Sequence, residues 1–233
     1  MIARARQAGV SEQVIPAIAL SGFEKLRALC RANEGLHPAW GLHPMYLAEH
    51  RPEHLDALHE WLERERPVAL GECGLDFFVE GLDADVQRMY FVRQLELART
   101  FDLPVILHAR RAVDEVIATI RRIGGLRGVV HSFSGSEEQA RQLWKLGFLI
   151  GLGGPITYER AHRLRALVAT MPLEFLLLET DAPDQPLATH RGERNEPAWL
   201  GEVLATVATL RGEDPQAIAQ ATTHNACRLF GLP

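Results

Sequence analysis

The stretch LPVILH at residues 103–108 decides the fold, because an apolar run there ends on a histidine. Strands buried on both faces read as continuous apolar runs, as in a parallel sheet that helices cover. Four further runs end near a histidine or an acidic residue, namely PAWGLHP with His43, PVALGE with Glu72, RGVVH with His131 and FLLLETD with Asp181. Because a parallel β/α barrel projects its reactive groups from the C-terminal ends of its strands, the five runs predict an active site at that end.

Apolar runs alternate with amphipathic stretches along the whole chain. This alternation predicts an α/β fold of the TIM-type (β/α) barrel class, with about seven strands surrounded by helices. We expect strands near 13–20, 38–43, 67–72, 104–108, 127–131, 147–152 and 175–181, and helices near 23–34, 53–64, 84–100, 111–123, 136–146, 158–170, 197–210 and 214–229. No low-complexity linker divides the chain, so residues 1–233 are predicted to form a single domain.

The overall charge and the cysteines limit the possible function classes. A formal net charge of −5 argues against a basic protein that coats nucleic acid, although bound divalent cations can supply positive charge to a local site. Cys30, Cys73 and Cys227 are odd in number and far apart, which argues against a disulfide framework and predicts a reducing, cytoplasmic location. Residues 1–9 lack the apolar core of a signal peptide, and no apolar run is long enough to cross a membrane, so neither export nor membrane insertion is predicted.

Four side chains are the predicted metal ligands. Glu72 lies between glycines in GECGLDF, where a carboxylate can bridge two cations. His108 and His131 follow apolar runs, and their neutral imidazoles suit Zn, Mn or Fe. Asp181 can bind a metal and take a proton from the attacking water, so Asp181 and Glu72 are also the predicted catalytic residues. Each has an ordinary structural alternative, such as a capping glutamate or a core histidine, but their convergence from separate strands favours a hydrolytic metal centre.

Other polar residues near the ends of these runs are candidates for supporting roles. Glu179, two residues before Asp181, is either a support for that carboxylate or a buried ion-pair partner, and the sequence leaves both interpretations open. His43 precedes a proline and is predicted to contact the substrate or its phosphate rather than the metal. Arg191 and Arg194 in HRGERNEP are candidates for bidentate phosphate binding, and Arg194 is the predicted substrate-binding residue.

The motifs GLHP, GECGLDF, LPVILHAR, HSFSGS, LLLETDAP and RNEP, in this order, resemble the TatD family of metal-dependent deoxyribonucleases. The closing TTHNACRLFGL is also similar to that family, so the resemblance covers essentially the whole chain. It implies an amidohydrolase-type (β/α)8 barrel with one or two divalent ions, Mg, Mn or Zn. It also implies cleavage of DNA, single-stranded or at 3′ ends, often as a 3′–5′ exonuclease, with no membrane or obligate protein partner.

The resemblance implies a role for each matching residue. Glu72 resembles the bridging carboxylate, and His108 and His131 resemble the two histidines of the second metal position. Asp181 resembles the aspartate of the first position. His43 and Arg194 match positions near the substrate phosphate.

The chain departs from the family pattern at its start. The family begins with a strand that carries an H-x-H pair, whereas IARARQAGV at residues 2–10 has the composition of the last turns of a helix. We therefore expect a barrel without its first strand and a weakened first metal position. A chain that starts inside a longer protein explains both features better than an open barrel. Two other functions stay open: a metal-dependent amide, ester or aminoacyl-tRNA hydrolase, and an impaired remnant that binds nucleic acid or a partner without turnover.

Overall fold

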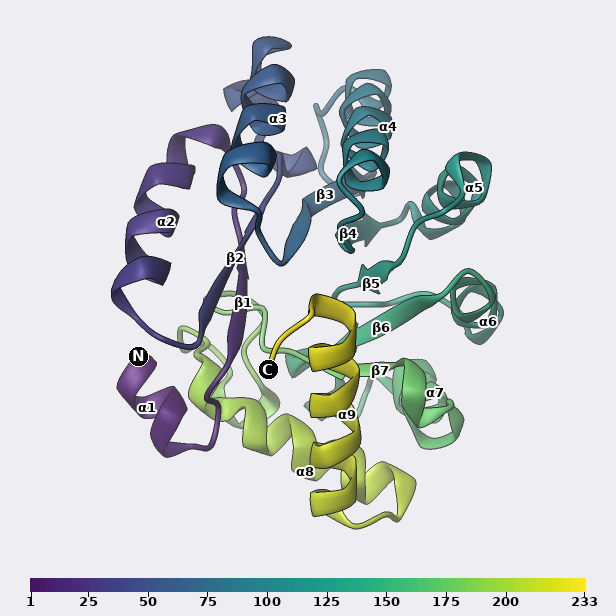
Figure 1. Cartoon of the computed structure of the whole chain (residues 1–233). Coiled ribbons are helices and arrows are strands. Elements are labelled where there is room, and N and C mark those ends of the chain that lie inside the picture. Colours follow the sequence, from purple (N-terminus) through teal and green to yellow (C-terminus); the bar gives the residue numbers. More distant parts are fainter. The chain divides into compact units, whose positions relative to one another are not determined.

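The computed structural model describes residues 1–233 and contains seven strands and nine α-helices (Figure 1). The strands are β1 (Gln13–Pro16), β2 (Leu36–Trp40), β3 (Ala69–Asp76), β4 (Val105–Arg110), β5 (Gly128–Val130), β6 (Phe148–Leu152) and β7 (Leu176–Leu178). The helices are α1 (Ile2–Gln7), α2 (Phe23–Ala32), α3 (Glu53–Glu65), α4 (Ala84–Thr100), α5 (Val113–Ile123), α6 (Glu137–Lys145), α7 (His162–Thr170), α8 (Leu200–Arg211) and α9 (Pro215–Phe230). None of these helices has the length and apolarity that a membrane-spanning segment requires.

The strands follow the chain order, β1 to β7, in a seven-stranded sheet. The pairs β1–β2, β2–β3, β3–β4, β4–β5 and β6–β7 are parallel, with registers such as Ala39 opposite Ala69 and Ile106 opposite Val129. This order confirms the predicted class, a TIM-type (β/α) barrel with seven strands surrounded by helices. Helices cover the sheet because its strands are apolar on both faces, as the continuous apolar runs of the sequence suggest. Strands β3 and β6, for example, are buried along their whole length.

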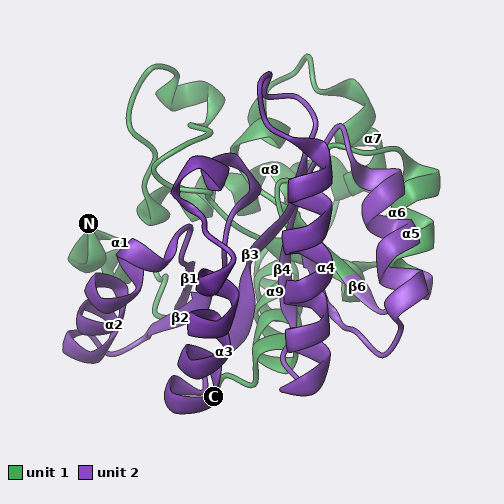
Figure 2. Cartoon of the chain, turned by 90° about the horizontal axis from the view of Figure 1, so that it is seen from above, with its two compact units in different colours: residues 1–11, 131–144, 149–233 green, residues 12–130, 145–148 purple.

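The chain divides into two compact units, coloured separately in Figure 2. Unit 1 comprises residues 1–11, 131–144 and 149–233, and unit 2 comprises residues 12–130 and 145–148. The single domain over 1–233 stays a prediction.

In unit 2, helices α2, α4 and α5 pack against β2, β3 and β4, respectively. An aromatic cluster of Phe23, Trp40 and Trp61 lies where α2 and α3 meet β2, with ring centroids 5.0 to 5.4 Å apart. All three side chains are buried, and burial of such a side chain stabilises the fold by about 1.5–3 kcal/mol. The cluster therefore anchors the helices that precede and follow the GLHP segment.

Glu65, at the end of α3, binds three arginines that lie near this cluster. Its carboxylate accepts hydrogen bonds from Arg27 at 3.2 Å, Arg64 at 3.0 Å and Arg31 at 2.9 Å, and its side chain is only 8% exposed. Burial raises the pKa of Glu65, but the hydrogen bonds from Arg64 and Arg27 and the charge of Arg31 outweigh it, so the pKa lies below its ordinary value of 4.5.

We expect Glu65→Gln to lower the free energy of unfolding by about 1 kcal/mol at neutral pH, because two of the three arginines are largely exposed and screened. A depressed folded-state pKa contributes stability that is present above the unfolded pKa and is lost as the pH falls through the folded value. Urea unfolding at neutral pH and at steps below 4.5 should therefore show the difference from the parent shrinking in acid. Glu63→Gln, on the exposed face of the same helix, is the matched control, and an equal difference at every pH would contradict the expectation.

Unit 1 contains β6 and β7 with helices α6 to α9 and α1. A capping box begins α6, because the Ser136 hydroxyl accepts from the Gln139 N–H at 3.2 Å and the Gln139 side chain accepts from the Ser136 N–H at 2.8 Å. Buried Asn225 of α9 donates to the carbonyls of Leu173 and Leu176 at 2.8 and 2.9 Å. The two hydrogen bonds of Asn225 fix the start of β7, the strand that precedes Glu179 and Asp181.

Candidate metal centre

Glu72 lies inside β3 and not at its end, which corrects the predicted boundary. The register between β3 and β4 shifts between Leu70 and Cys73, and β3 then continues to Asp76. A bulge of this kind re-aims side chains, and the apolar pattern of PVAL does not reveal it. Gly74 permits the close pairing that follows, because a Cβ on this residue (φ 148°) would lie 2.0 Å from the His108 carbonyl oxygen.

The remaining predicted strand ends shift by a few residues as well. His108 lies within β4, which continues to Arg110, whereas His131 directly follows β5. His43 lies in the loop after β2, where it begins the short 3-10 helix Pro44–Glu49, and Asp181 lies beyond the end of β7.

Unit 2 brings His43, Glu72 and His108 together in one group. The Glu72 Oε1 atom lies 2.8 Å from His43 Nε2 and 3.1 Å from His108 Nδ1. One donor atom from each of the three side chains lies within 4.8 Å of the other two. His43 and Glu72 are buried and His108 is half-buried, so the group is largely shielded from solvent.

Asp76 completes the surroundings of His108, and the sequence analysis missed it. Its Oδ2 atom lies 2.8 Å from His108 Nε2, and its side chain is fully buried. Burial raises the pKa of Asp76, but hydrogen bonds from His108, Val79 and Phe78 outweigh it and hold the pKa at about 2. The ionised carboxylate therefore accepts a hydrogen bond from the Nε2–H of His108. The other ring nitrogen, Nδ1, then carries no proton, and its lone pair faces Glu72. The signal in the sequence was the acidic residue in GLDF, four positions after Glu72 on a strand that continues.

A backbone N–H group fixes the tautomer of His43. The N–H of Met45 donates to His43 Nδ1 at 3.1 Å, so this nitrogen is an acceptor and the neutral ring carries its proton on Nε2. The Nε2–H then donates to Glu72. A ring nitrogen that carries a proton cannot ligate a metal, and this tautomer favours a hydrogen-bonding role for His43. Its predicted contact with substrate stays a prediction.

Two buried glutamines of α4 hold the backbone segments that carry these residues. Gln94 accepts from the Leu42 N–H at 2.8 Å and donates to the Leu42 carbonyl at 3.0 Å, next to His43. Gln87 accepts from the Asp76 N–H at 2.7 Å and donates to the Asp76 carbonyl at 2.8 Å. Because the two glutamines are seven residues apart, they lie on the same face of the helix. Helix α4 thus positions both sides of the group.

Cys73, which follows Glu72, contributes no nucleophile. The thiol is fully buried, and burial together with the charge of Glu72 raises the pKa of Cys73. The thiol therefore stays protonated and acts as a small apolar side chain.

Unit 1 brings the other two predicted ligands, His131 and Asp181, near one another. His131 Nδ1 lies 3.8 Å from Asp181 Oδ1 and 3.8 Å from Glu179 Oε1. Glu179 accepts from the Ser132 N–H at 2.5 Å, and the charge of Asp181 also acts on its carboxyl group. Burial raises the pKa of Glu179 to about 7 despite the opposing effect of His131.

Gln185 and Asn195 hold the loop that carries Asp181. Gln185 donates to Asp181 Oδ2 and, at 2.7 Å, to the hydroxyl of Ser132. The buried side chain of Asn195 donates to the carbonyls of Thr180 at 2.5 Å, Asp184 at 2.8 Å and Gln185 at 3.1 Å. Neither residue was a candidate from the sequence, although Asn195 belongs to the quoted RNEP motif. Together they hold Asp181 in a left-handed backbone conformation, with φ at 56°.

The arginines of HRGERNEP lie in an exposed loop of unit 1. Arg191 ends the 3-10 helix Ala188–His190, and Arg194 precedes Asn195. Neither side chain is brought into contact with His131 or Asp181. The predicted substrate-binding role of Arg194 stays a prediction.

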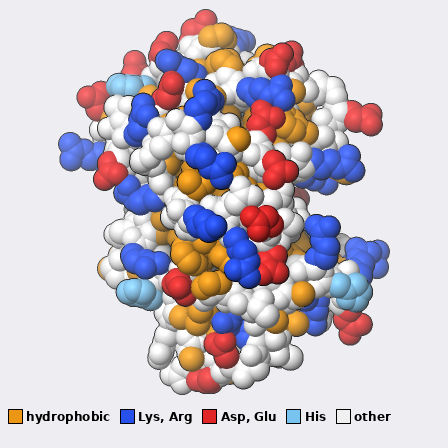
Figure 3. Space-filling model, turned by 90° about the vertical axis from the view of Figure 1, so that its right-hand side faces the viewer, with side chains coloured by type: hydrophobic (Ala, Val, Ile, Leu, Met, Phe, Trp, Pro, Cys, Tyr) orange, Lys and Arg blue, Asp and Glu red, His pale blue; other side chains and the backbone are white.

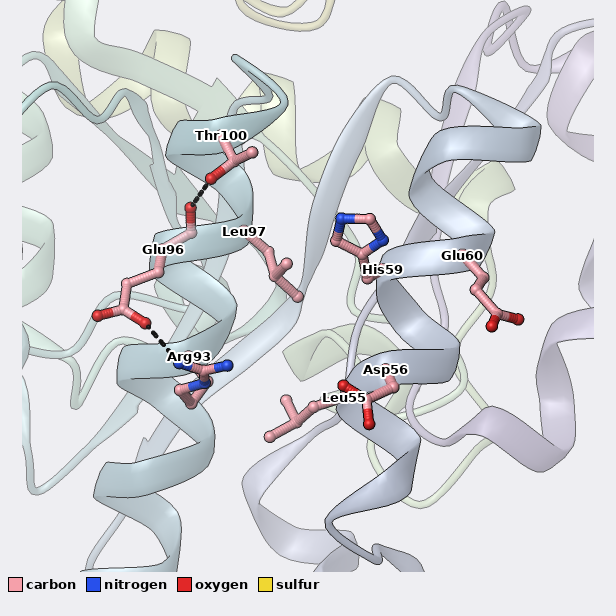
Figure 4. Close-up of a pocket in the computed structure, with 8 residues that line it drawn as sticks. All are labelled: Leu55, Asp56, His59, Glu60, Arg93, Glu96, Leu97 and Thr100. Carbon is pink, nitrogen blue, oxygen red and sulfur yellow. Dashed lines mark hydrogen bonds and ion pairs between the residues drawn. The ribbon is translucent and has the colours of Figure 1, made fainter.

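A surface pocket of about 510 Å³ lies between α3 and α4 (Figure 4). None of the predicted site residues lines it. Within it, Arg93 pairs with Glu96 at 3.4 Å and the Thr100 hydroxyl donates to the Glu96 carbonyl at 2.9 Å. Its lining residues are Leu55, Asp56, His59, Glu60, Arg93, Glu96, Leu97 and Thr100. The chemistry therefore centres on the buried group and not on this pocket.

The donor set of the buried group fits a divalent cation. Glu72 supplies a carboxylate oxygen and His108 supplies Nδ1, a nitrogen and oxygen combination that Zn and Mn accept. His108 also has the carboxylate on its second nitrogen that metal-ligating histidines ordinarily have.

The comparisons with known proteins agree with this chemistry. The family model described as TatD related DNase matches residues 1–231. A metal-dependent hydrolase of Escherichia coli K12, YjjV, described as uncharacterized, is 43% identical over 233 residues, which are 99% of this chain and 90% of the relative. The protein of Cronobacter sakazakii named 3′-5′ ssDNA/RNA exonuclease TatD is 40% identical over 237 residues, which are 99% of this chain and 90% of the relative. The crystal structure of YjjV, titled a TatD homolog, superposes with a TM-score of 0.95 at 42% identity, covering 100% of this chain and 91% of that one.

Proposed function

Because this chain belongs to the TatD family of metal-dependent hydrolases, we propose that it cleaves phosphodiester bonds in single-stranded nucleic acid, from the 3′ end. The observation that carries the proposal is the buried Glu72–His108 pair, with Asp76 on the second nitrogen of the histidine. The relative from Cronobacter sakazakii, named as a 3′-5′ ssDNA/RNA exonuclease, supports the substrate class and the polarity.

The residues of unit 2 have distinct parts in the proposed reaction. When bound at Glu72 and His108, a divalent cation supplies Lewis acidity toward a phosphoryl oxygen and makes water more acidic. Asp76 holds His108 in the tautomer that presents Nδ1, and the Met45 N–H holds His43 in the tautomer that presents an N–H. This N–H donates to Glu72 and holds that carboxylate in place. The contact of His43 with the substrate phosphate rests on its position in the GLHP motif.

The motif order adds three residues of unit 1 to the proposal. Asp181 takes the proton of the attacking water, and His131 is a further metal ligand. Arg194 contacts the substrate phosphate. These assignments rest on the positions of the residues in the family motifs.

A nuclease assay tests the proposal with oligonucleotides labelled at the 5′ end and, separately, at the 3′ end. We expect metal-dependent release of mononucleotides from the 3′ end of single-stranded DNA and RNA, supported by Mg²⁺, Mn²⁺ or Zn²⁺ and abolished by a chelator. An oligonucleotide with a blocked 3′ end should resist, and double-stranded DNA should react more slowly. Aminoacyl-tRNA and small carboxylic esters belong in the same panel. Hydrolysis of these, with intact DNA and RNA, would contradict the proposal and favour the ester hydrolase.

A further inference from the structure

An exposed aromatic residue beside the metal centre holds two arginines. Phe78 follows β3, and its side chain is 43% exposed. The guanidinium carbon of Arg110 lies 3.7 Å from the centroid of the Phe78 ring, and that of Arg111 lies 4.7 Å from it. Both arginines are exposed at the end of β4. Such contacts hold a cation over the ring face and restrict the rotamers of a long side chain.

The arginine pair lies close to His108 along the same strand. Arg110 follows His108 by two residues on β4, so their side chains are on the same face, about 7 Å apart along the strand. The Asp76 carboxylate connects His108 with Phe78, because Oδ2 accepts from His108 Nε2 and Oδ1 accepts from the Phe78 N–H at 2.9 Å. The residue that orients the metal ligand therefore also positions the aromatic ring.

The charge of this pair has no carboxylate partner. Basic and acidic side chains are interspersed over the face drawn in Figure 3, and elsewhere arginines such as Arg88 and Arg127 pair with acidic side chains. Arg110 and Arg111 make no ion pair, and their recorded side-chain interactions are those with Phe78. In a chain with a net charge of −5, two neighbouring unpaired guanidinium groups attract an anion.

We propose that Arg110 and Arg111, held over Phe78, bind the phosphate that neighbours the scissile one in a single-stranded nucleic acid. The inference rests on the proposed function, because it requires a polynucleotide whose scissile phosphate lies at the Glu72–His108 pair. Guanidinium groups match phosphate oxygens with paired donors, and the separation along β4 is comparable with the spacing of adjacent phosphates on an extended strand. The site explains how a protein of negative net charge can hold a polyanion near its metal centre.

A comparison of two substrates tests the site. A single-stranded oligonucleotide has a phosphate next to the scissile one, whereas the p-nitrophenyl ester of thymidine 5′-monophosphate has none. We expect Arg110→Gln/Arg111→Gln to lower the ratio of kcat/KM for the oligonucleotide to kcat/KM for the ester by about tenfold, mainly through KM. In a plot of log KM for the oligonucleotide against log salt concentration, the slope should also fall by about one, the effect of one lost phosphate contact.

Single substitutions separate binding from folding. Phe78→Tyr keeps the ring and should retain the substrate ratio, whereas Phe78→Leu should lower it in the same direction as the arginine variants. Arg122→Gln, at an exposed arginine on α5, is the matched control and should leave the ratio unchanged. Equal thermal unfolding of all variants shows that the fold persists.

The outcomes distinguish the two proposals. If the parent protein degrades DNA or RNA and the double variant keeps its substrate ratio and salt slope, the phosphate site is overturned and the nuclease function stands. If the parent protein degrades neither DNA nor RNA, the proposed function fails and the phosphate site falls with it.

Discussion

Replacement of Glu72 by glutamine is expected to abolish metal-dependent hydrolysis almost completely, with a loss of more than about a hundredfold in kcat. The Glu72 carboxylate is the shared partner of His43 Nε2 and His108 Nδ1. An amide has the same shape but no charge, and its NH₂ group cannot ligate a cation. Loss of the metal removes several kcal/mol of transition-state stabilisation, and each 1.36 kcal/mol corresponds to a factor of about ten.

The measurement combines metal content per chain with the rate of nucleotide release. Glu63→Gln, an exposed glutamate on α3, makes the same chemical change outside the group and should retain both the metal and the rate. Circular dichroism of the two variants verifies the fold. A Glu72→Gln protein that keeps its metal and its full rate would remove Glu72 from the centre.

Replacement of Asp76 by asparagine is expected to lower metal affinity by about ten- to a hundredfold, although Asp76 does not face the metal position. In the parent, Oδ1 accepts from the N–H groups of Phe78 and Val79, at 2.9 and 3.0 Å. The asparagine oxygen must keep this position, so its NH₂ group replaces Oδ2 and donates toward His108 Nε2. The ring then carries its proton on Nδ1, and the lone pair that faces Glu72 is lost.

Two measurements test this tautomer argument. Calorimetric titration of the metal-free protein with Zn²⁺ gives the affinity, and ¹⁵N NMR of the histidine ring gives the protonated nitrogen. Asp56→Asn, exposed on α3, is the matched control. Unchanged affinity, with Nδ1 still unprotonated in Asp76→Asn, would refute a role of Asp76 in setting the tautomer.

The sequence predicts the order of the elements well because long periodic runs determine it. Helix α4 has the predicted bounds 84–100, and α5 differs from its prediction only at its first residues. The bulge in β3 was not predictable from apolar periodicity, since it depends on how Gly74 passes the His108 carbonyl. Glu72 was therefore placed at the wrong point of its strand, and its predicted roles as metal ligand and catalytic residue stay predictions.

The residues of the candidate site also fall into those that the sequence pattern could identify and those that it could not. Residue type and position after an apolar run were sufficient to choose His43, Glu72 and His108, which the structure brings together. They were not sufficient for Asp76, Gln87 or Gln94, because those roles depend on side chains that meet backbone groups far away in the sequence. The tautomer of His43 likewise depends on a single backbone N–H, at Met45, which no pattern of residue types specifies.

The two glutamines of α4 make the length of this helix a constraint on the chemistry. Gln87 and Gln94 are about 10.5 Å apart along the axis, and an inserted or deleted residue between them would turn one of them by about 100° away from its backbone partner. The clamp on Leu42 or the clamp on Asp76 would then be lost, and with it the placement of His43 or of the carboxylate behind His108. Exposed positions between the two glutamines can change in identity without this effect. In descendants of this chain, substitutions should accumulate along the outer face of α4, whereas changes in its length should be eliminated.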